Sequence, residues 1–284
     1  MHAEILKSLT SSENLSLGML TGTMARTVNY PLLTWKNASQ QSLPISFNPS
    51  VVYRGLPASC VNYGATIGMQ FLLTGFFSKK LSGFDTESNS PSVLTQIGAP
   101  LAGGFCAGIP CSILELVMIQ QQRFGGSAFQ IVPKLVHQFG ITSLSRAMAM
   151  TVSRESLFTL SMLGLTPAIQ YELVNRFHMN KDASLAIGAL TSSAFATTVT
   201  HPMDTIKTCM QGDMCKKQYT TIMQTANSLV KNHGIVDGLF KGINWRFLQI
   251  SVGFFMINKL KEVVMPVIFQ DKFDKLTQKK EEIP

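Results

Sequence analysis

Three charged side chains lie deep inside apolar stretches of the chain, where charge is costly. Arg26 interrupts residues 15–35, and the adjacent Arg154 and Glu155 interrupt residues 147–171. Ionisable residues inside a membrane are rare, and they either pair with one another or mark a path for a solute. A guanidinium binds a carboxylate through two parallel hydrogen bonds, and a neighbouring glutamate is able to receive an ammonium group. These residues indicate a site for a small carboxylate or amino-acid-like solute, with mutual neutralisation of Arg154 and Glu155 as the alternative.

A second pattern places an acid, a base and a glutamine at helical spacing. Residues 202–211 read Pro-Met-Asp-Thr-Ile-Lys-Thr-Cys-Met-Gln, so that Asp204 and Lys207 are three positions apart. Residues at this spacing share one face of a helix, and a proline inside a helix bends it. Bent helices can converge at one end of a bundle, and acids and bases that face the bundle axis can then pair between helices.

Two partial copies of this pattern occur earlier in the chain, at residues 31–40 and 113–122. We align the second copy on Ile113 rather than on Pro110. The Ile113 register recovers an acid at Glu115 and the glutamine at the end of the pattern, whereas the Pro110 register recovers the proline alone. Pro110 is then expected to bend its helix about one turn early.

A basic residue recurs at nearly constant spacing and supports a threefold repeat. Arg54, Arg146 and Lys241 are 92 and 95 positions apart, and each precedes an apolar stretch. Internal repeats of this kind decide the architecture of a whole chain. We therefore predict one domain over residues 1–284, made of the repeats 14–85, 90–176 and 182–270 and a polar tail, 271–284.

The elements that position these residues are predicted to be membrane-spanning helices. Only 14% of the residues are charged, against about 25% in soluble proteins, which disfavours a soluble helical protein. Uncharged windows such as 183–203 are long enough to cross a hydrocarbon layer about 30 Å thick. We predict an all-α membrane protein with six transmembrane helices, near residues 14–40, 55–80, 92–122, 147–174, 183–212 and 243–269. Short amphipathic helices are expected at 127–139 and 218–232, whereas the segment 41–52 is too short for a comparable one.

The remaining composition excludes several function classes. The net charge of +8 favours contact with anionic lipid, because no basic cluster is interleaved with aromatic residues as in nucleic-acid-binding proteins. The five cysteines form no CxxC pair and are interpreted as small buried hydrophobic residues. We find no paired carboxylates, metal-ligand cluster or phosphate-binding loop, and we therefore predict that the protein is not an enzyme.

Over residues 14–265 the sequence resembles the mitochondrial carrier family, a divergent member of which would carry these three repeats. The resemblance implies a multi-pass protein of the inner mitochondrial membrane whose acid–base pairs close a gate on the matrix side. It implies that Asp204 pairs with Lys36 and Glu115 with Lys207, whereas the third pair, Leu33 with Met118, is apolar. The resemblance also implies braces below the gate, at Gln40, Gln122 and Gln211.

The resemblance further implies where solute and lipid bind. Contact positions for the solute fall on Asn62, on Arg154 with Glu155, and on Gln249, and Arg26 shares the pore face of the first helix. Cardiolipin is implied as a bound lipid, without any other cofactor. The residues implied for lipid binding are Tyr53, Arg54, Gly55, Phe240, Lys241 and Gly242.

The opposite gate of the family, an aromatic-acid-x-x-base pattern, falls on residues 74–78, 166–170 and 261–265. The first two copies lack both charges, and the third keeps only Glu262. Since alternating access needs two gates of comparable strength, two functions stay open. One is a carrier for a small carboxylate or amino-acid-like solute. The other is a carrier-derived structural subunit that no longer transports and belongs to a larger complex with respiratory subunits as partners.

Overall fold

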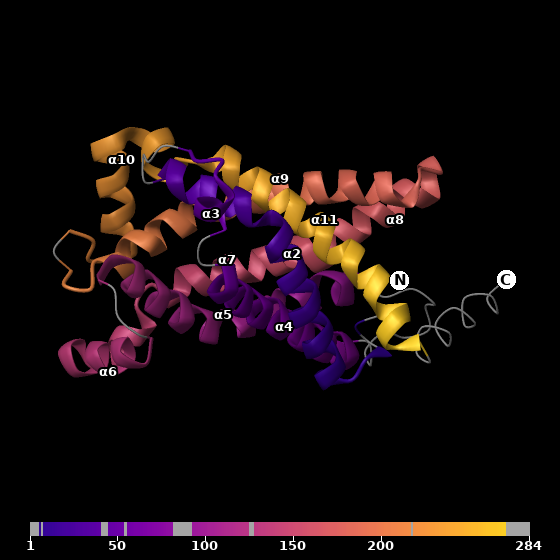
Figure 1. The fold of residues 1–284 in the computed structure, drawn as a ribbon, viewed down its shortest axis with the longest axis horizontal. Helices are drawn as coiled ribbons and strands as arrows, with labels where there is room; N and C mark the ends of the chain where they lie inside the picture. Colours follow the sequence, from indigo (N-terminus) through magenta and orange to yellow (C-terminus); the bar gives the residue numbers. More distant parts are fainter. Residues whose placement is uncertain are drawn as a thin grey trace.

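The structure is a computed structural model that describes residues 6, 8–40, 45–53, 56–81, 93–124, 128–216 and 218–270. Helices are the only regular elements in these residues, which confirms the predicted all-α class. The long helices run along one direction (Figure 1). They are α2 (Ser11–Gln40), α4 (Leu56–Leu81), α5 (Val93–Phe124), α9 (Lys181–Gly212), α11 (Ile243–Ile268), and a continuous rod formed by α7 (Met148–Thr159), η3 (Leu160–Leu165) and α8 (Thr166–Phe177).

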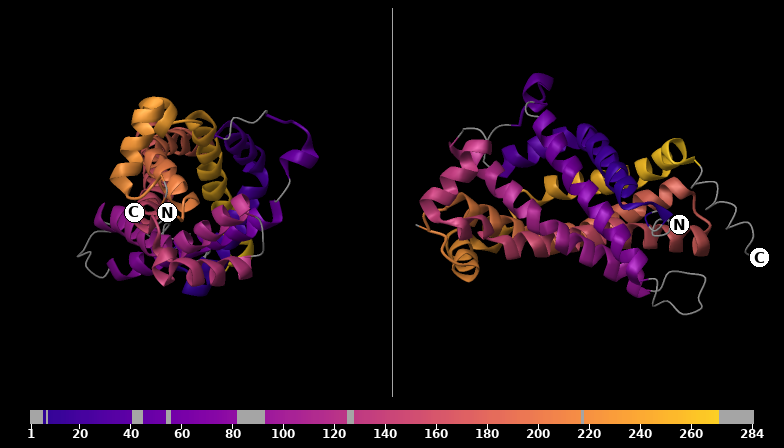
Figure 2. Two further views of the ribbon diagram at one scale, coloured as in Figure 1. Left: turned by 90° about the vertical axis from the view of Figure 1, so that its left-hand side faces the viewer. Right: turned by 90° about the horizontal axis from the view of Figure 1, so that it is seen from below.

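The long helices close a ring around a common axis. Each packs against the next one along the chain, from α2 through α4, α5, α7 with α8, and α9 to α11, and α11 returns to α2. Figure 2 shows this arrangement from two further directions. Residues far apart in the sequence are thereby brought to one axis.

Shorter helices lie at one end of the ring, away from the chain termini (Figure 1). α6 (Ala128–Phe139) matches the predicted amphipathic segment 127–139. α10 (Ile222–Leu239) overlaps the predicted segment 218–232 but continues beyond it, and it is interrupted at Gly234 by a positive φ of 76°. The corresponding segment of the first repeat holds a single helical turn, α3 (Pro49–Val52).

Glycine allows the first two long helices to approach closely. A Cβ atom on Gly18 would lie 2.7 Å from the Cα atom of Gly68, and one on Gly22 would lie 2.9 Å from the Cβ atom of Ile67. Small residues at this spacing are typical of helix contacts inside membranes. The contact sets the position of α2, and with it the position of Arg26.

The rod of α7, η3 and α8 contains one π-helical section. Pro167 lacks a backbone N–H group, and its ring crowds the carbonyl of the residue four positions earlier. The π-helical turn at residues 160–165 precedes it and widens the helix there. Thr166 donates a hydrogen bond from Oγ1 to the Ser161 carbonyl at 2.9 Å, which supplies a side-chain donor in this section.

Large apolar side chains also cover much of the outside of the ring. Three helical segments are long and apolar enough to cross a membrane, at 95–117, 141–177 and 181–212 in the part of the chain that was described. Exposed contiguous apolar surface marks a membrane or protein interface. Examples on five different long helices are Val28, Val61, Phe105, Leu190 and Val263.

Candidate functional site

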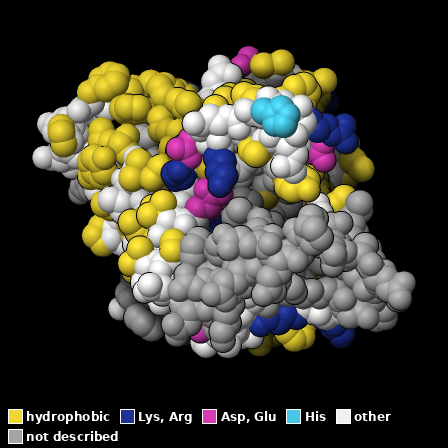
Figure 3. Space-filling model, turned by 90° about the vertical axis from the view of Figure 1, so that its right-hand side faces the viewer, with side chains coloured by type: hydrophobic (Ala, Val, Ile, Leu, Met, Phe, Trp, Pro, Cys, Tyr) yellow, Lys and Arg dark blue, Asp and Glu magenta, His cyan; other side chains and the backbone are white. Residues whose placement is uncertain are grey.

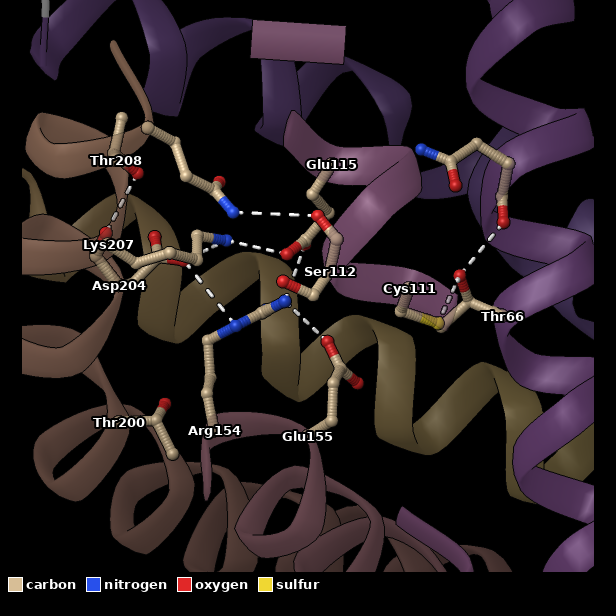
Figure 4. A network of polar contacts seen from close by, with 12 residues as sticks. Thr66, Cys111, Ser112, Glu115, Arg154, Glu155, Thr200, Asp204, Lys207 and Thr208 are labelled. Atoms are coloured by element: carbon tan, nitrogen blue, oxygen red, sulfur yellow. Dashed lines mark hydrogen bonds and ion pairs between the residues drawn. The ribbon is translucent and has the colours of Figure 1, made fainter. Parts of the chain in front are cut away.

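Seven charged side chains from five helices meet inside the ring. We call them the ionic network: Lys36 of α2, Glu115 of α5, Arg154 and Glu155 of α7, Asp204 and Lys207 of α9, and Arg246 of α11. All lie largely out of contact with solvent. Figure 4 shows Glu115, Arg154, Glu155, Asp204 and Lys207. Buried charges persist only when they are paired, so the network requires the helix faces that carry it to point at the axis.

Glu115 joins α5 to two other helices. Its Oε2 atom accepts a hydrogen bond from Lys207 Nζ at 2.8 Å, and its Oε1 atom accepts one from Arg154 Nη2 at 2.5 Å. The Glu115–Lys207 pair is one of the two pairs that the repeat pattern predicts. The second contact, with Arg154, was not predicted.

Asp204 is surrounded by four cations. Its carboxylate oxygens lie 2.6 Å from Arg246 Nη1, 3.3 Å from Lys207 Nζ, 3.6 Å from Arg154 Nε and 4.0 Å from Lys36 Nζ. The predicted Asp204–Lys36 pair is therefore present only at its outer limit, and Arg246 makes the close contact. Arg246 lies inside the predicted helix 243–269, but no role was predicted for it from the sequence.

Arg154 and Glu155 belong to this network. Glu155 pairs with Arg154, and its other oxygen accepts a hydrogen bond from Gln70 Nε2 at 2.7 Å. The pair was predicted as a solute contact, with mutual neutralisation as the alternative. The structure places both groups against each other, and Arg154 also contacts Glu115 and Asp204.

Glutamine side chains lie on the side of the network toward α6 and α10. Gln211 is fully buried and donates to the carbonyls of Ser112 at 3.5 Å and Arg146 at 3.3 Å. Gln120 Nε2 donates to the Gln211 carbonyl at 2.6 Å, although the pattern pointed to Gln122. The side chains of Gln40, Gln122 and Met118 fall outside the described part of the structure.

Arg26 lies apart from the network and has a different environment. Only 8% of its surface is exposed, and its guanidinium lies 3.7 Å from the ring centroid of Tyr63 on α4. Among the described residues none accepts a hydrogen bond from Nε or Nη1, and none forms an ion pair with it. The ring face of Tyr63 attracts the cation but does not neutralise it.

Asn29, one helical turn after Arg26, offers an acceptor next to this cation. It is 2% exposed, and its Nδ2 atom faces the carbonyl of Gln249 at 3.5 Å. Its Oδ1 atom receives no hydrogen bond from the residues that the structure describes. The predicted contacts Asn62 and Gln249 lie on the adjoining α4 and α11, where they are half-buried.

The described residues that were predicted to bind lipid lie just before α4 and α11. Tyr53 stacks on Tyr30 with ring centroids 6.1 Å apart, and Phe240 stacks on His201 at 6.0 Å. Gly242 takes a positive φ of 78° before α11. Arg54 and Gly55 lie outside the described residues.

In the second repeat, Arg146 occupies the position that corresponds to Arg54 and Lys241 in the other two repeats. It donates to the carbonyls of Met210 at 2.9 Å and Asp213 at 3.0 Å, and so holds the turn after α9. A cavity of about 490 Å³ adjoins it, lined also by Phe139, Thr142, Met214 and Lys216.

Comparisons with known proteins point to one family. The family model described as mitochondrial carrier protein matches residues 180–271. A mitochondrial glycine transporter of Yarrowia lipolytica is 21% identical, with 79% of this chain and 76% of the relative covered. A mitochondrial coenzyme A transporter of Xenopus tropicalis is 25% identical, with 89% and 83% covered. A glycine transporter of Vanderwaltozyma polyspora reaches 47% identity over 22% of this chain and 20% of its own.

The family match includes the complete Pro202–Gln211 pattern, whose Asp204 and Lys207 lie in the ionic network. The alignments to full-length relatives extend this likeness over most of the chain. The chain is therefore similar to mitochondrial carriers over most of its length, and its residues 180–271 match the model of that family.

Proposed function

We propose that this protein is a carrier of the inner mitochondrial membrane that moves a small carboxylate or amino-acid-like solute by alternating access. In this proposal six helices span the membrane as three two-helix repeats, 14–85, 90–176 and 182–270. The closed ring of long helices and its apolar exterior support the arrangement. Relatives named as transporters of glycine and of coenzyme A support solute transport.

The observation that carries the proposal is the environment of Arg26. A buried cation without a counter-ion is strongly unfavourable, and the described residues supply no carboxylate to it. A solute carboxylate would fill this role through two parallel hydrogen bonds. The free Oδ1 atom of Asn29 would accept a hydrogen bond from an amino group on the same solute.

The ionic network supplies the gate on the matrix side in this proposal. Its carboxylates have several cations within reach, so that Arg154 is able to stay paired with one acid while another pair separates. Such a network divides the opening into steps instead of requiring all pairs to break together. The half-buried Asn62 and Gln249 would contact the solute between the gate and Arg26.

Cardiolipin is proposed to bind at the helix starts on the same side. Tyr53 and Phe240 would frame two of these positions, with Lys241 beside the second. The cavity beside Arg146 and Lys216 lies between the second and third repeats. Its two cations would favour the anionic head groups of lipids.

Uptake into liposomes that contain cardiolipin tests the transport proposal. Radiolabelled glycine and other small amino acids and carboxylates are compared in the wild type and the Arg26→Gln variant. Because the variant loses a charged contact to the solute, kcat/KM should fall at least about tenfold. Arg176→Gln is the matched control, since Arg176 is an exposed residue paired with Glu172. Wild-type uptake by Arg26→Gln would contradict the assignment.

The structural-subunit alternative rests on a separate observation, the missing charges of the opposite gate. Mild detergent extraction from mitochondria separates the two proposals. Migration in stoichiometric amount with a respiratory complex, together with no uptake of any tested solute, would favour the subunit.

A further inference from the structure

Two leucines that precede α2 are buried at the end of the ring that lies opposite the ionic network. Leu6 and Leu9 are 2% and 0% exposed and belong to the same apolar cluster as Phe71 of α4 and Ile257 of α11. Figure 3 views this end, where charged side chains lie on the end face and apolar ones on the flank. Two large apolar side chains from outside the ring therefore contribute to its core.

A local motif directs this segment into the ring. The Thr10 backbone N–H donates to Glu13 Oε2 at 2.7 Å, and the Glu13 N–H donates to Thr10 Oγ1 at 3.3 Å. This reciprocal capping box pairs two backbone N–H groups at the start of α2, and the residue just before such a cap is often apolar. Leu9 occupies that position.

Two side chains of the ring hold the backbone of the segment. Asn14 Nδ2, which is buried, donates to the Leu6 carbonyl at 2.8 Å. Lys79 near the end of α4 donates to the Leu9 carbonyl. The segment is thus attached to both α2 and α4, and its buried carbonyls have partners, as buried polar groups require.

The contact depends on the absence of a side chain at Gly75. A Cβ atom there would lie 2.3 Å from Asn14 Nδ2 and 2.9 Å from the Leu6 carbonyl oxygen. Gly75 is also the residue that takes the acid position in the first copy of the opposite gate pattern. The segment and an acidic gate residue at position 75 are therefore mutually exclusive.

The third copy of the pattern is also changed at this end. Lys261 is fully buried and donates to the neutral Asn258 Oδ1 at 3.0 Å, below the ring of Phe71. Asn258 in turn donates to the Met162 carbonyl at 3.0 Å. Neutral and apolar contacts thus surround the one gate position that keeps a buried charge.

We propose that Leu6 and Leu9 form the gate of this end, an apolar plug that replaces the missing acid–base pairs. Leu6 and Leu9 close the entrance by packing against Phe71 and Ile257, and Gly75 provides the room. Asn14 and Lys79 hold the plug in its closed position. Opening then requires the segment to leave the ring as a unit, while α2 stays in place behind its capping box.

Cysteine labelling of single-site variants tests whether the segment is buried in the folded protein. Leu9→Cys and Ser11→Cys are made separately in the full chain, and a membrane-impermeant maleimide is added to the protein in liposomes. Site-specific labelling is read by peptide mass spectrometry, so that the five natural cysteines can stay. The cysteine at position 9 should react at least about tenfold more slowly than that at position 11, because only a local opening exposes it. Equal rates would overturn the proposal.

A second measurement asks whether the segment closes the ring. Asn258→Cys serves as the reporter, alone and combined with Leu6→Ser and Leu9→Ser, or with Gly75→Ala. Both combinations should raise the labelling rate at position 258 about tenfold and leave the buried Cys111, near the network, unchanged. Leu20→Ser, an exposed leucine on α2, is the matched control.

An unchanged rate at position 258 in folded variants of both kinds would overturn the proposal. If the substitutions prevent folding, seen as loss of helical circular dichroism, the comparison of positions 9 and 11 decides alone. Both readouts measure access and need no transported solute, so they are independent of the uptake experiment.

Discussion

The two ends of the ring are closed by different kinds of interaction. At one end, charged groups from five helices form the ionic network around Glu115 and Asp204. At the other, Leu6 and Leu9 pack against an apolar cluster, and the buried Lys261 bonds to the neutral Asn258. Ion pairs are directional and weaken when water enters, whereas apolar contacts depend on the area removed from water. The two ends of the ring are therefore expected to open under different conditions, the ionic end when water enters and the apolar end when its packed area is reduced.

The largest effect is expected at the centre of the network. Asp204→Asn removes the carboxylate that four cations share and leaves buried positive charge uncompensated. The free energy of unfolding should fall by about 3–5 kcal/mol, as on breaking a buried ion pair. Thermal unfolding in detergent micelles, followed by circular dichroism, measures the change. A loss below that of an exposed aspartate would show that the network does not hold its end closed.

The next largest loss of stability is expected at the opposite end of the ring. Leu9→Ala removes a fully buried side chain and should cost about 2–4 kcal/mol, the range of buried leucine truncations. Leu20→Ala, at an exposed leucine of α2, should cost far less. The same thermal scans compare the two, and equal losses would mean that the segment does not pack in the ring.

A double-mutant cycle sharpens the comparison between strong and weak pairs. Glu115→Gln and Lys207→Met, alone and together, should show a coupling energy of about 1–3 kcal/mol, as for contacting residues in one network. The same cycle on Lys36 and Asp204, whose closest atoms are 4.0 Å apart, should give a smaller coupling. The reverse order would contradict the geometry of the network.

The smallest effect is expected for an exposed pair near the opposite end. Asp182 and Lys259 form an ion pair with side chains that are 59% and 35% exposed. Asp182→Asn should change the stability by at most about 1 kcal/mol, and the change should shrink in high salt. A loss as large as that of Asp204→Asn would remove the contrast between buried and exposed charge.

Much of the fold could be predicted from local pattern. The predicted span 14–40 is α2 (Ser11–Gln40), and 183–212 is α9 (Lys181–Gly212). Long runs without charge and breaks at polar residues are properties of neighbouring residues, so a single sequence reveals them. The short segment before α4 was likewise expected to hold no comparable helix, and α3 is one turn.

The partners of the charged groups could be predicted only in part. The resemblance to the carrier family implied the pairs Glu115–Lys207 and Asp204–Lys36. It did not show that Arg154 joins Glu115 or that Arg246 makes the close contact with Asp204. Those contacts depend on the rotation of α7 and α11 about their own axes, which is set by packing with neighbouring helices.

The sequence by itself determined the helical class, the apolar stretches and the positions that carry charge inside them. Only the tertiary structure decided which of these charges pair, and that Arg26 has no ion-pair partner among the residues it describes. It also decided that Leu6 and Leu9 are buried, since nothing in a short segment before a helix records the opening at Gly75. The physical reason is that pattern is a local property, whereas pairing and burial depend on residues that only the closed ring brings together.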